Sequence, residues 1–162
     1  IVLTGSGYVL PAADGVVVTG STYDRGNDDP EPQLQSHEAN LLRLAQLLPQ
    51  ARVAADAATL EGAVGFRCVA PDHLPLIGAM PAVDAACIRK PALSGAQLTD
   101  LPRCPVLYCA SAFASRGLVW AALAGELLAS LIEGEPLPLE GDLADALDPG
   151  RFVLKQARRG IL

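Results

Sequence analysis

The chain has 162 residues, of which 51% are hydrophobic and 19% charged, with a mean hydropathy of +0.31 and a formal net charge of −6. This length fits a single domain, and the acidic balance argues against wholesale nucleic-acid binding, because cations must meet the phosphates. The charge is uneven, because residues 150–162 carry four basic side chains and no acid. This leaves eight basic and eighteen acidic residues in the rest of the chain. The opening IVLTG has no initiator Met and no signal-peptide pattern, so we expect a piece of a longer protein.

The first predicted elements are two strands joined at Asp14-Gly15, a pair typical of tight hairpin turns. Val16–Val18 predict a buried continuation of the second strand. After a polar, acidic loop, Ser36 is expected to cap a helix over SHEANLLRLAQLLPQ, whose Leu side chains recur at helical spacing and which ends at a proline. A weaker helical or irregular stretch is expected over residues 51–60.

The middle of the chain predicts a strand over Ala63–Val69 that carries one charge, Arg67. The following PDHLPLIGAMP is expected to hold little regular structure because of its three prolines and its glycine. A loop region over residues 84–101, with a short strand at 86–89, leads to a buried strand over Pro105–Ser111. A buried helix is expected from Leu118 onward. Its apolar run contains Glu126 and is too short for a membrane span of about 20 residues.

A ladder of small side chains on this helix, Ala121, Gly125 and Ala129, predicts a face that another backbone approaches closely. The loop before the helix, SAFASRG, places unpaired first-turn N–H groups at a site suited to negative charge. It is not a GxGxxG loop and lacks the P-loop lysine, so pyrophosphate is not its obvious ligand. A flavin ring, whose pyrimidine edge becomes negative on reduction, is one alternative. An ordinary packed strand–helix corner is the other.

Arg67 is the second unusual residue, because a buried guanidinium requires a partner. It suits bidentate recognition of a carboxylate, but a salt bridge to Asp72 is an equally simple explanation. Asp72 itself follows Pro71 and is expected to form a turn. We assign no catalytic residue. The cysteines show no CxxC spacing, and we expect them to be reduced core residues with no metal site: Cys68, Cys87, Cys104 and Cys109.

Two stretches, GFRCVAPDHLPLIG and LYCASAFASRGLVWAALAGELLASLIEGEPLP, resemble the C-terminal part of the D-amino acid oxidase-like flavoprotein superfamily. With STYDRG, ASRGL and ALDPGRFVLKQARRG, the chain is similar to the FAD-dependent half of the bifunctional bacterial enzymes that make 5-methylaminomethyl-2-thiouridine in tRNA. The resemblance implies an α+β fold of a substrate-domain sheet plus a flavin-facing helix, with the N-terminal Rossmann segment missing. Residues 1–134 would belong to the FAD-dependent oxidoreductase domain, and residues 135–162 would form an acidic loop and a basic tail.

The activity implied by this resemblance is FAD-dependent removal of the carboxymethyl group from carboxymethylaminomethyl-(2-thio)uridine at the tRNA wobble position. The products would be aminomethyl-uridine and glyoxylate, and the reaction would be cytoplasmic, with no membrane and no metal. The implied partners are tRNA and, from the same protein, the Rossmann segment and a methyltransferase domain. The implied site residues are Arg67 for the substrate carboxylate, Ala114, Ser115, Arg116, Gly117 and Leu118 for the flavin, and Arg151, Lys155, Arg158 and Arg159 for tRNA.

Two other functions remain open at this point. One is oxidation of a small amine or amino acid such as glycine or sarcosine, which would use the same flavin and the same Arg67. The basic tail distinguishes this function from tRNA modification, because a free amino acid substrate does not need the tail. The other is a catalytically silent module that serves only for packing or interaction.

Overall fold

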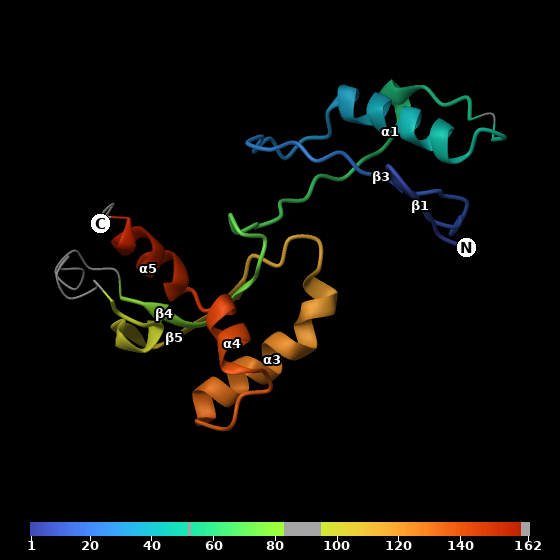
Figure 1. The fold of residues 1–162 in the computed structure, drawn as a ribbon. Helices are drawn as coiled ribbons and strands as arrows, with labels where there is room; N and C mark the ends of the chain where they lie inside the picture. The colour runs from blue at the N-terminus through green and yellow to red at the C-terminus, as the bar shows by residue number, and fades with distance from the viewer. Residues whose placement is uncertain (52, 83–94, 160–162) are drawn as a thin grey trace. The chain divides into compact units, whose positions relative to one another are not determined.

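The computed structural model describes residues 1–51, 53–82 and 95–159 (Figure 1). They form two compact units, Ile1–Phe66 and Arg67–Leu162. Both units contain helices and small antiparallel sheets, as an α+β fold requires. The strand expected at residues 86–89, and Cys87 within it, lie outside the described residues. Among the residues that are described, no helix has the length and apolar composition needed to cross a bilayer.

The first unit contains a three-stranded antiparallel sheet in the order β1 (Leu3–Thr4), β2 (Tyr8–Val9) and β3 (Thr19–Gly20). The predicted turn between β2 and β3 is confirmed, since Asp14 and Gly15 have φ angles of 51° and 80°. These positive angles are the ones that a two-residue hairpin turn needs. The predicted burial of residues 16–18 is wrong. These valines lie in the segment between β2 and β3 and are exposed.

Helix α1 (Leu34–Leu47) confirms the predicted helix, but Ser36 is not its cap. The helix begins one turn earlier because Gln33 is still extended, and the Gln33 side chain donates to Asp29 Oδ2 at 2.7 Å instead of capping. Leu44 is the buried residue of α1, which packs beside β3 and a short 3-10 helix, η1 (Ala57–Thr59).

The second unit is built on an antiparallel pair, β4 (Leu76–Pro81) and β5 (Arg103–Ser111), with Ile77 opposite Ala110. The expectation of irregular structure over PDHLPLIGAMP is therefore wrong. Pro75 precedes β4 and Pro81 is its last residue, so neither removes a hydrogen bond from the interior of the ladder. The predicted strand β5 is confirmed, although it is not buried as expected, since much of its middle is exposed.

Residues 63–69 do not form the predicted strand. Val69 makes an isolated antiparallel bridge to Phe113, and the residues before it pair with no strand in the described chain. The reason is physical: a strand needs a partner along its length, and here one pair of residues supplies it. Phe66 is 64% exposed, so this segment is also not the buried run that its composition suggested.

Three helices pack against β4: α3 (Gly117–Glu133), α4 (Gly141–Leu147) and α5 (Gly150–Arg158). In Figure 1 the two strands lie between α5 and α3. Residues 135–159, expected as an acidic loop and a basic tail, thus contain two helices of this unit. Helix α3 ends at Gly134, whose φ of 72° is the left-handed cap that favours glycine.

Two apolar clusters hold the second unit together. The first lies between α3, α4 and β4, and the second lies where α5 meets the 3-10 helix η2 (Leu98–Asp100). Their buried members are Ile77, Ala124, Leu127 and Leu147 in the first cluster and Ala96, Leu101, Val153 and Leu154 in the second. The face of α3 that carries the small-residue ladder is not part of either cluster and is exposed. Helix α3 is therefore buried on one side, not all round as expected.

Candidate flavin-facing site

The loop between β5 and α3 runs beside the segment that carries Arg67. Val69 and Phe113 form a backbone bridge, and the Ala114 N–H donates to the Cys68 carbonyl at 3.1 Å. Ala112 and Ala114 have φ angles of 60° and 51°, uncommon for residues with a Cβ. The chain thus accepts local strain to turn sharply from β5 into α3.

This arrangement brings two of the predicted site residues together. Arg67 Nη1 donates to Ser115 Oγ at 2.6 Å, so the arginine expected to bind a carboxylate touches the loop expected to lie along a flavin. Arg67 is exposed and lies outside any strand, contrary to the expectation of a buried guanidinium. The alternative partner, Asp72, forms its ion pair with Arg151.

Arg116 lies at the entrance of α3 and binds a neighbouring turn. Its Nη2 donates to the His73 carbonyl at 2.8 Å. His73 has a φ of 60°, and the turn around it is closed by Asp72 Oδ1, which accepts from the Leu74 N–H at 3.1 Å. Asp72 is therefore the turn-forming residue that the sequence predicted.

The start of α3 presents backbone N–H donors at an exposed position. Gly117 and Leu118 begin the helix, where first-turn N–H groups have no partner within the helix. The Leu118 side chain is 97% exposed, and adding a Cβ to Gly117 would meet nothing closer than 3.8 Å, so this end of the helix is open to a ligand. Two guanidinium groups, from Arg67 and Arg116, add positive charge near these donors. The donor set thus suits a group that becomes anionic on reduction.

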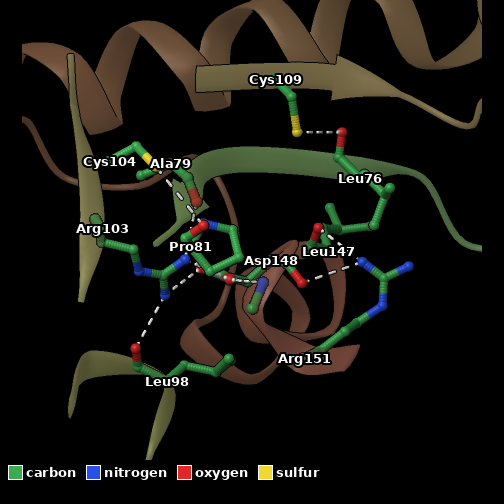
Figure 2. Close-up of polar contacts among 11 residues, drawn as sticks. Leu76, Ala79, Pro81, Leu98, Arg103, Cys104, Cys109, Leu147, Asp148 and Arg151 are labelled. Atoms are coloured by element: carbon green, nitrogen blue, oxygen red, sulfur yellow. Dashed lines mark hydrogen bonds and ion pairs between the residues drawn. The ribbon is translucent and has the colours of Figure 1, made fainter. Parts of the chain in front are cut away.

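An ion pair that the sequence analysis missed holds the strands to α5. Figure 2 shows Arg103 of β5 bound to Asp148, with Nη1–Oδ1 at 2.8 Å and Nη2–Oδ2 at 3.0 Å. The same guanidinium donates to the carbonyls of Ala79 and Leu98, both at 2.9 Å. Asp148 Oδ1 also accepts from the Gly150 N–H at 2.6 Å, at the start of α5. A lone charged residue at the start of an apolar strand was the signal that could have predicted a partner.

Arg151, expected to contact tRNA, has all five of its N–H donors bonded inside the unit. Two go to the Asp72 carboxylate at 2.8 and 3.0 Å, and one goes to the Leu74 carbonyl at 3.0 Å. The other two go to the carbonyls of Leu147 and Asp148, as Figure 2 shows. Arg151 lowers the pKa of Asp72, chiefly by hydrogen bonding to the ionised carboxylate, against a smaller opposing effect of burial.

The other three basic residues expected to contact tRNA, Lys155, Arg158 and Arg159, are exposed near the end of α5. Arg158 Nη2 donates to the Ala96 carbonyl at 3.1 Å. A shallow cavity of about 280 Å³ lies beside it, lined by Gln97, Leu98, Asp145, Arg151, Leu154 and Arg158. The acid in this lining opposes phosphate, so the exposed end of α5 is the better candidate surface for a polyanion.

The STYDRG turn lines a second shallow cavity, within the first unit. The cavity measures about 290 Å³, and its polar lining includes an arginine that donates to the Ser21 carbonyl. Its lining residues are Thr22, Tyr23, Asp24, Asn27, Gln33, Gln35, Ser36, Ala39 and Arg43. Sequence reasoning singled out this turn but not the residues of α1 that complete the cavity.

The structure describes three of the four cysteines, Cys68, Cys104 and Cys109. Burial raises the pKa of Cys109, and the charge of Asp148 raises it further, so the thiol stays protonated at neutral pH. Cys104 is half-buried, whereas Cys68 is exposed and is not the core residue that we expected. Among residues 1–51, 53–82 and 95–159, no group of three or more His, Cys, Asp or Glu residues could hold a metal ion.

Comparison with known proteins identifies the family of this chain. The FAD dependent oxidoreductase family matches residues 1–131. The chain belongs to this family. The flavin implied by the family description is FAD, and the D-amino acid oxidase-like resemblance of the sequence is confirmed. The family match spans both structural units and includes the Arg67 segment and most of helix α3.

The chain is also similar to curated proteins named tRNA 5-methylaminomethyl-2-thiouridine biosynthesis bifunctional protein MnmC. It is 51% identical to those of Burkholderia mallei (strain SAVP1) and Burkholderia pseudomallei (strain 668) over 157 residues, which is 96% of this chain and 24% of each relative. It is 53% identical to that of Cupriavidus necator over 163 residues, which is 98% of this chain and 25% of the relative. The chain thus spans about a quarter of the length of the curated relatives it matches.

Proposed function

We propose that the protein containing this chain uses FAD to remove the carboxymethyl group from carboxymethylaminomethyl-(2-thio)uridine at the tRNA wobble position. The secondary amine R–NH–CH2–COO⁻ loses two electrons and two protons, and water then releases R–NH2 and glyoxylate. The observation that carries the proposal is the 2.6 Å hydrogen bond from Arg67 to Ser115, which joins the guanidinium that we propose for the carboxylate to the loop that we propose for the flavin. The names of relatives that are 51–53% identical support tRNA, and hence the cytoplasm, as the setting.

Bound FAD would supply the oxidising group, and the residues of this chain would orient what it acts on. Arg67 would hold the substrate carboxylate with its planar fork and so present the adjacent CH2 carbon to the flavin. The first N–H groups of α3, at Gly117 and Leu118, would face the part of the ring that gains negative charge. Such a reaction needs no strong base in the chain once the amine is neutral.

The small-residue face of α3 supports a further part of this proposal. Ala121, Gly125 and Ala129 are exposed in this chain, and a Cβ added to Gly125 would have nothing within 4 Å. We propose that the dinucleotide-binding part of the same protein packs against this face, which lets the two backbones approach closely. A methyltransferase domain would be the other covalent partner, as the word bifunctional in the relatives' names suggests.

The decisive experiment supplies the full-length protein with FAD and tRNA that carries the carboxymethylaminomethyl nucleoside. We expect conversion to the aminomethyl nucleoside with an equal amount of glyoxylate. The Arg67→Lys variant keeps the charge but loses the fork, and we expect its kcat/KM to fall by roughly one to two orders of magnitude. Unchanged kinetics in this variant would show that Arg67 does not bind the carboxylate.

Oxidation of a small amine is the second candidate, favoured by the same contact between Arg67 and Ser115. Variants at the exposed basic end of α5 distinguish a tRNA substrate from a free small amine. Replacing Lys155, Arg158 and Arg159 together by Gln should weaken tRNA binding and reduce its salt dependence by a slope of about 2–3. Turnover of free glycine or sarcosine with release of hydrogen peroxide, and no conversion of tRNA, would establish the small-molecule reading instead.

A further inference from the structure

Arg151 differs from the other basic residues of α5 in how its charge is used. Its side chain is 12% exposed, and its five N–H donors bind Asp72, Leu74 and two carbonyls at the end of α4. A guanidinium with no remaining donor offers little to a phosphate. Lys155 and Arg159, in contrast, are exposed.

The turn that Arg151 binds is hydrogen-bonded to the flavin-facing loop. Asp72 and Leu74, which Arg151 contacts, lie on either side of His73, and the His73 carbonyl accepts from Arg116 Nη2 at 2.8 Å. Arg116 is the residue before helix α3 and lies within the loop assigned to FAD. A continuous series of hydrogen bonds therefore joins α5 to this loop through one short turn.

The turn needs external support, because His73 has a left-handed backbone with a φ of 60°. A residue with a Cβ is sterically disfavoured in this region. The conformation persists where the surroundings hold it on both sides. Arg151 does so, through the carboxylate of Asp72 before His73 and the carbonyl of Leu74 after it. The lowered pKa of Asp72 agrees with a carboxylate that stays ionised in this contact.

We propose that Arg151 is a positioning residue for the FAD site: by pinning the turn around His73, it fixes the carbonyl that holds Arg116 at the start of α3. This inference rests on the proposed flavin-facing role of residues 114–118. It assigns Arg151 to the support of the FAD-binding loop and leaves tRNA binding to the exposed basic residues of α5. Helix α5 then supports FAD binding through Arg151 and tRNA binding through its exposed basic side chains.

The test compares Arg151→Gln with Arg158→Gln in the full-length protein. Three quantities are measured: the FAD dissociation constant by flavin fluorescence, the visible absorption spectrum of the bound flavin, and the dissociation constant of tRNA. Arg151→Gln should weaken FAD binding roughly tenfold and shift the flavin spectrum, with tRNA affinity within about twofold of wild type. Arg158→Gln should weaken tRNA binding and leave the flavin spectrum unchanged. Arg151→Lys, which keeps the charge but not the fork, should lie between wild type and Arg151→Gln.

A second set of variants separates positioning from general destabilisation. Arg116→Gln should weaken FAD binding to a similar extent, and the double variant with Arg151→Gln should add little, because both act through one series of contacts. Additive losses would overturn the inference and indicate a merely structural role for Arg151. If Arg116→Gln weakens FAD binding and Arg151→Gln does not, the link through His73 is wrong while the flavin-facing loop stands. If neither variant affects FAD, the assignment of the loop is wrong, and the inference about Arg151 is wrong with it.

Discussion

The ion pair between Arg103 and Asp148 gives the sharpest prediction about stability. Replacing Arg103 by Met keeps most of the side-chain volume but removes four hydrogen bonds, two of them to the carboxylate. Asp148 would retain its contact with the Gly150 N–H, but its charge would lose its counterion. The two side chains are 24% and 21% exposed, so the pair is largely but not fully removed from water.

The expected loss follows from these numbers. Breaking a fully buried pair from one side costs about 3–5 kcal/mol, whereas an exposed pair contributes about 0–1 kcal/mol. With roughly a fifth to a quarter of each side chain exposed, we expect Arg103→Met to lower the free energy of local opening by about 3 kcal/mol. The loss should fall on β4, β5 and the start of α5, which Arg103 connects.

Hydrogen exchange of individual amides measures this quantity directly. Amides of β4 and β5 should exchange roughly 100-fold faster in Arg103→Met than in wild type. Arg43→Met, which removes an arginine contact within the first unit, serves as the matched control and should leave exchange in β4 and β5 unchanged. A change below about 1 kcal/mol in Arg103→Met would show that the pair behaves as an exposed one, and the reasoning from burial would be wrong.

Four further predictions concern the second unit. The pKa of Asp72 is lower in the folded state than its ordinary value, so its carboxylate should stabilise the fold above that ordinary pKa. This stabilisation should be lost as pH falls through the lowered pKa. In urea unfolding, the difference in stability between Asp72→Asn and wild type should therefore be present at neutral pH and disappear in acid. Leu127→Ala, at a position 1% exposed, should cost about 3–5 kcal/mol in the same assay. Gly150→Ala should lower the free energy of unfolding by about 1–3 kcal/mol, because the new Cβ would lie 2.7 Å from one side chain and 2.9 Å from a carboxylate oxygen. Gly125→Ala, where the new Cβ would have nothing within 4 Å, should instead raise the free energy of unfolding of the isolated chain by about 0.5–1 kcal/mol.

Local chemistry was sufficient to predict several elements. Asp14-Gly15 predicted a turn because few residue pairs tolerate two positive φ angles, and the helix over residues 34–47 followed from leucine spacing. The start of that helix was wrong, since Gln33 is held by Asp29 and Ser36 is not used as the cap. Strand β4 was not predicted because the number of prolines in this segment argued against regular structure. The prolines lie outside the strand or at its end, where they allow it to form.

Burial and pairing were harder to predict, because they depend on residues far away in the sequence. The apolar composition of residues 63–69 indicated a strand, yet a strand forms only where another edge is available along its length. The same applies to Asp72: its nearest cation in sequence was Arg67, but its ion pair comes from Arg151, a residue 79 positions further along. The family resemblance supplied the site residues, while their contacts came only from the structure.

The residues of the proposed site are exposed to solvent in this chain. Arg67 is exposed, and the first turn of α3 presents the almost fully exposed Leu118. A carboxylate bound to Arg67 in water would gain little, because exposed ion pairs contribute about 0–1 kcal/mol. The same contact becomes selective when water is excluded around it. On this reasoning, bound FAD and the polypeptide that we propose to cover the small-residue face of α3 do more than complete the fold. By enclosing Arg67, they would make its contact with the carboxylate strong enough to hold the substrate in place.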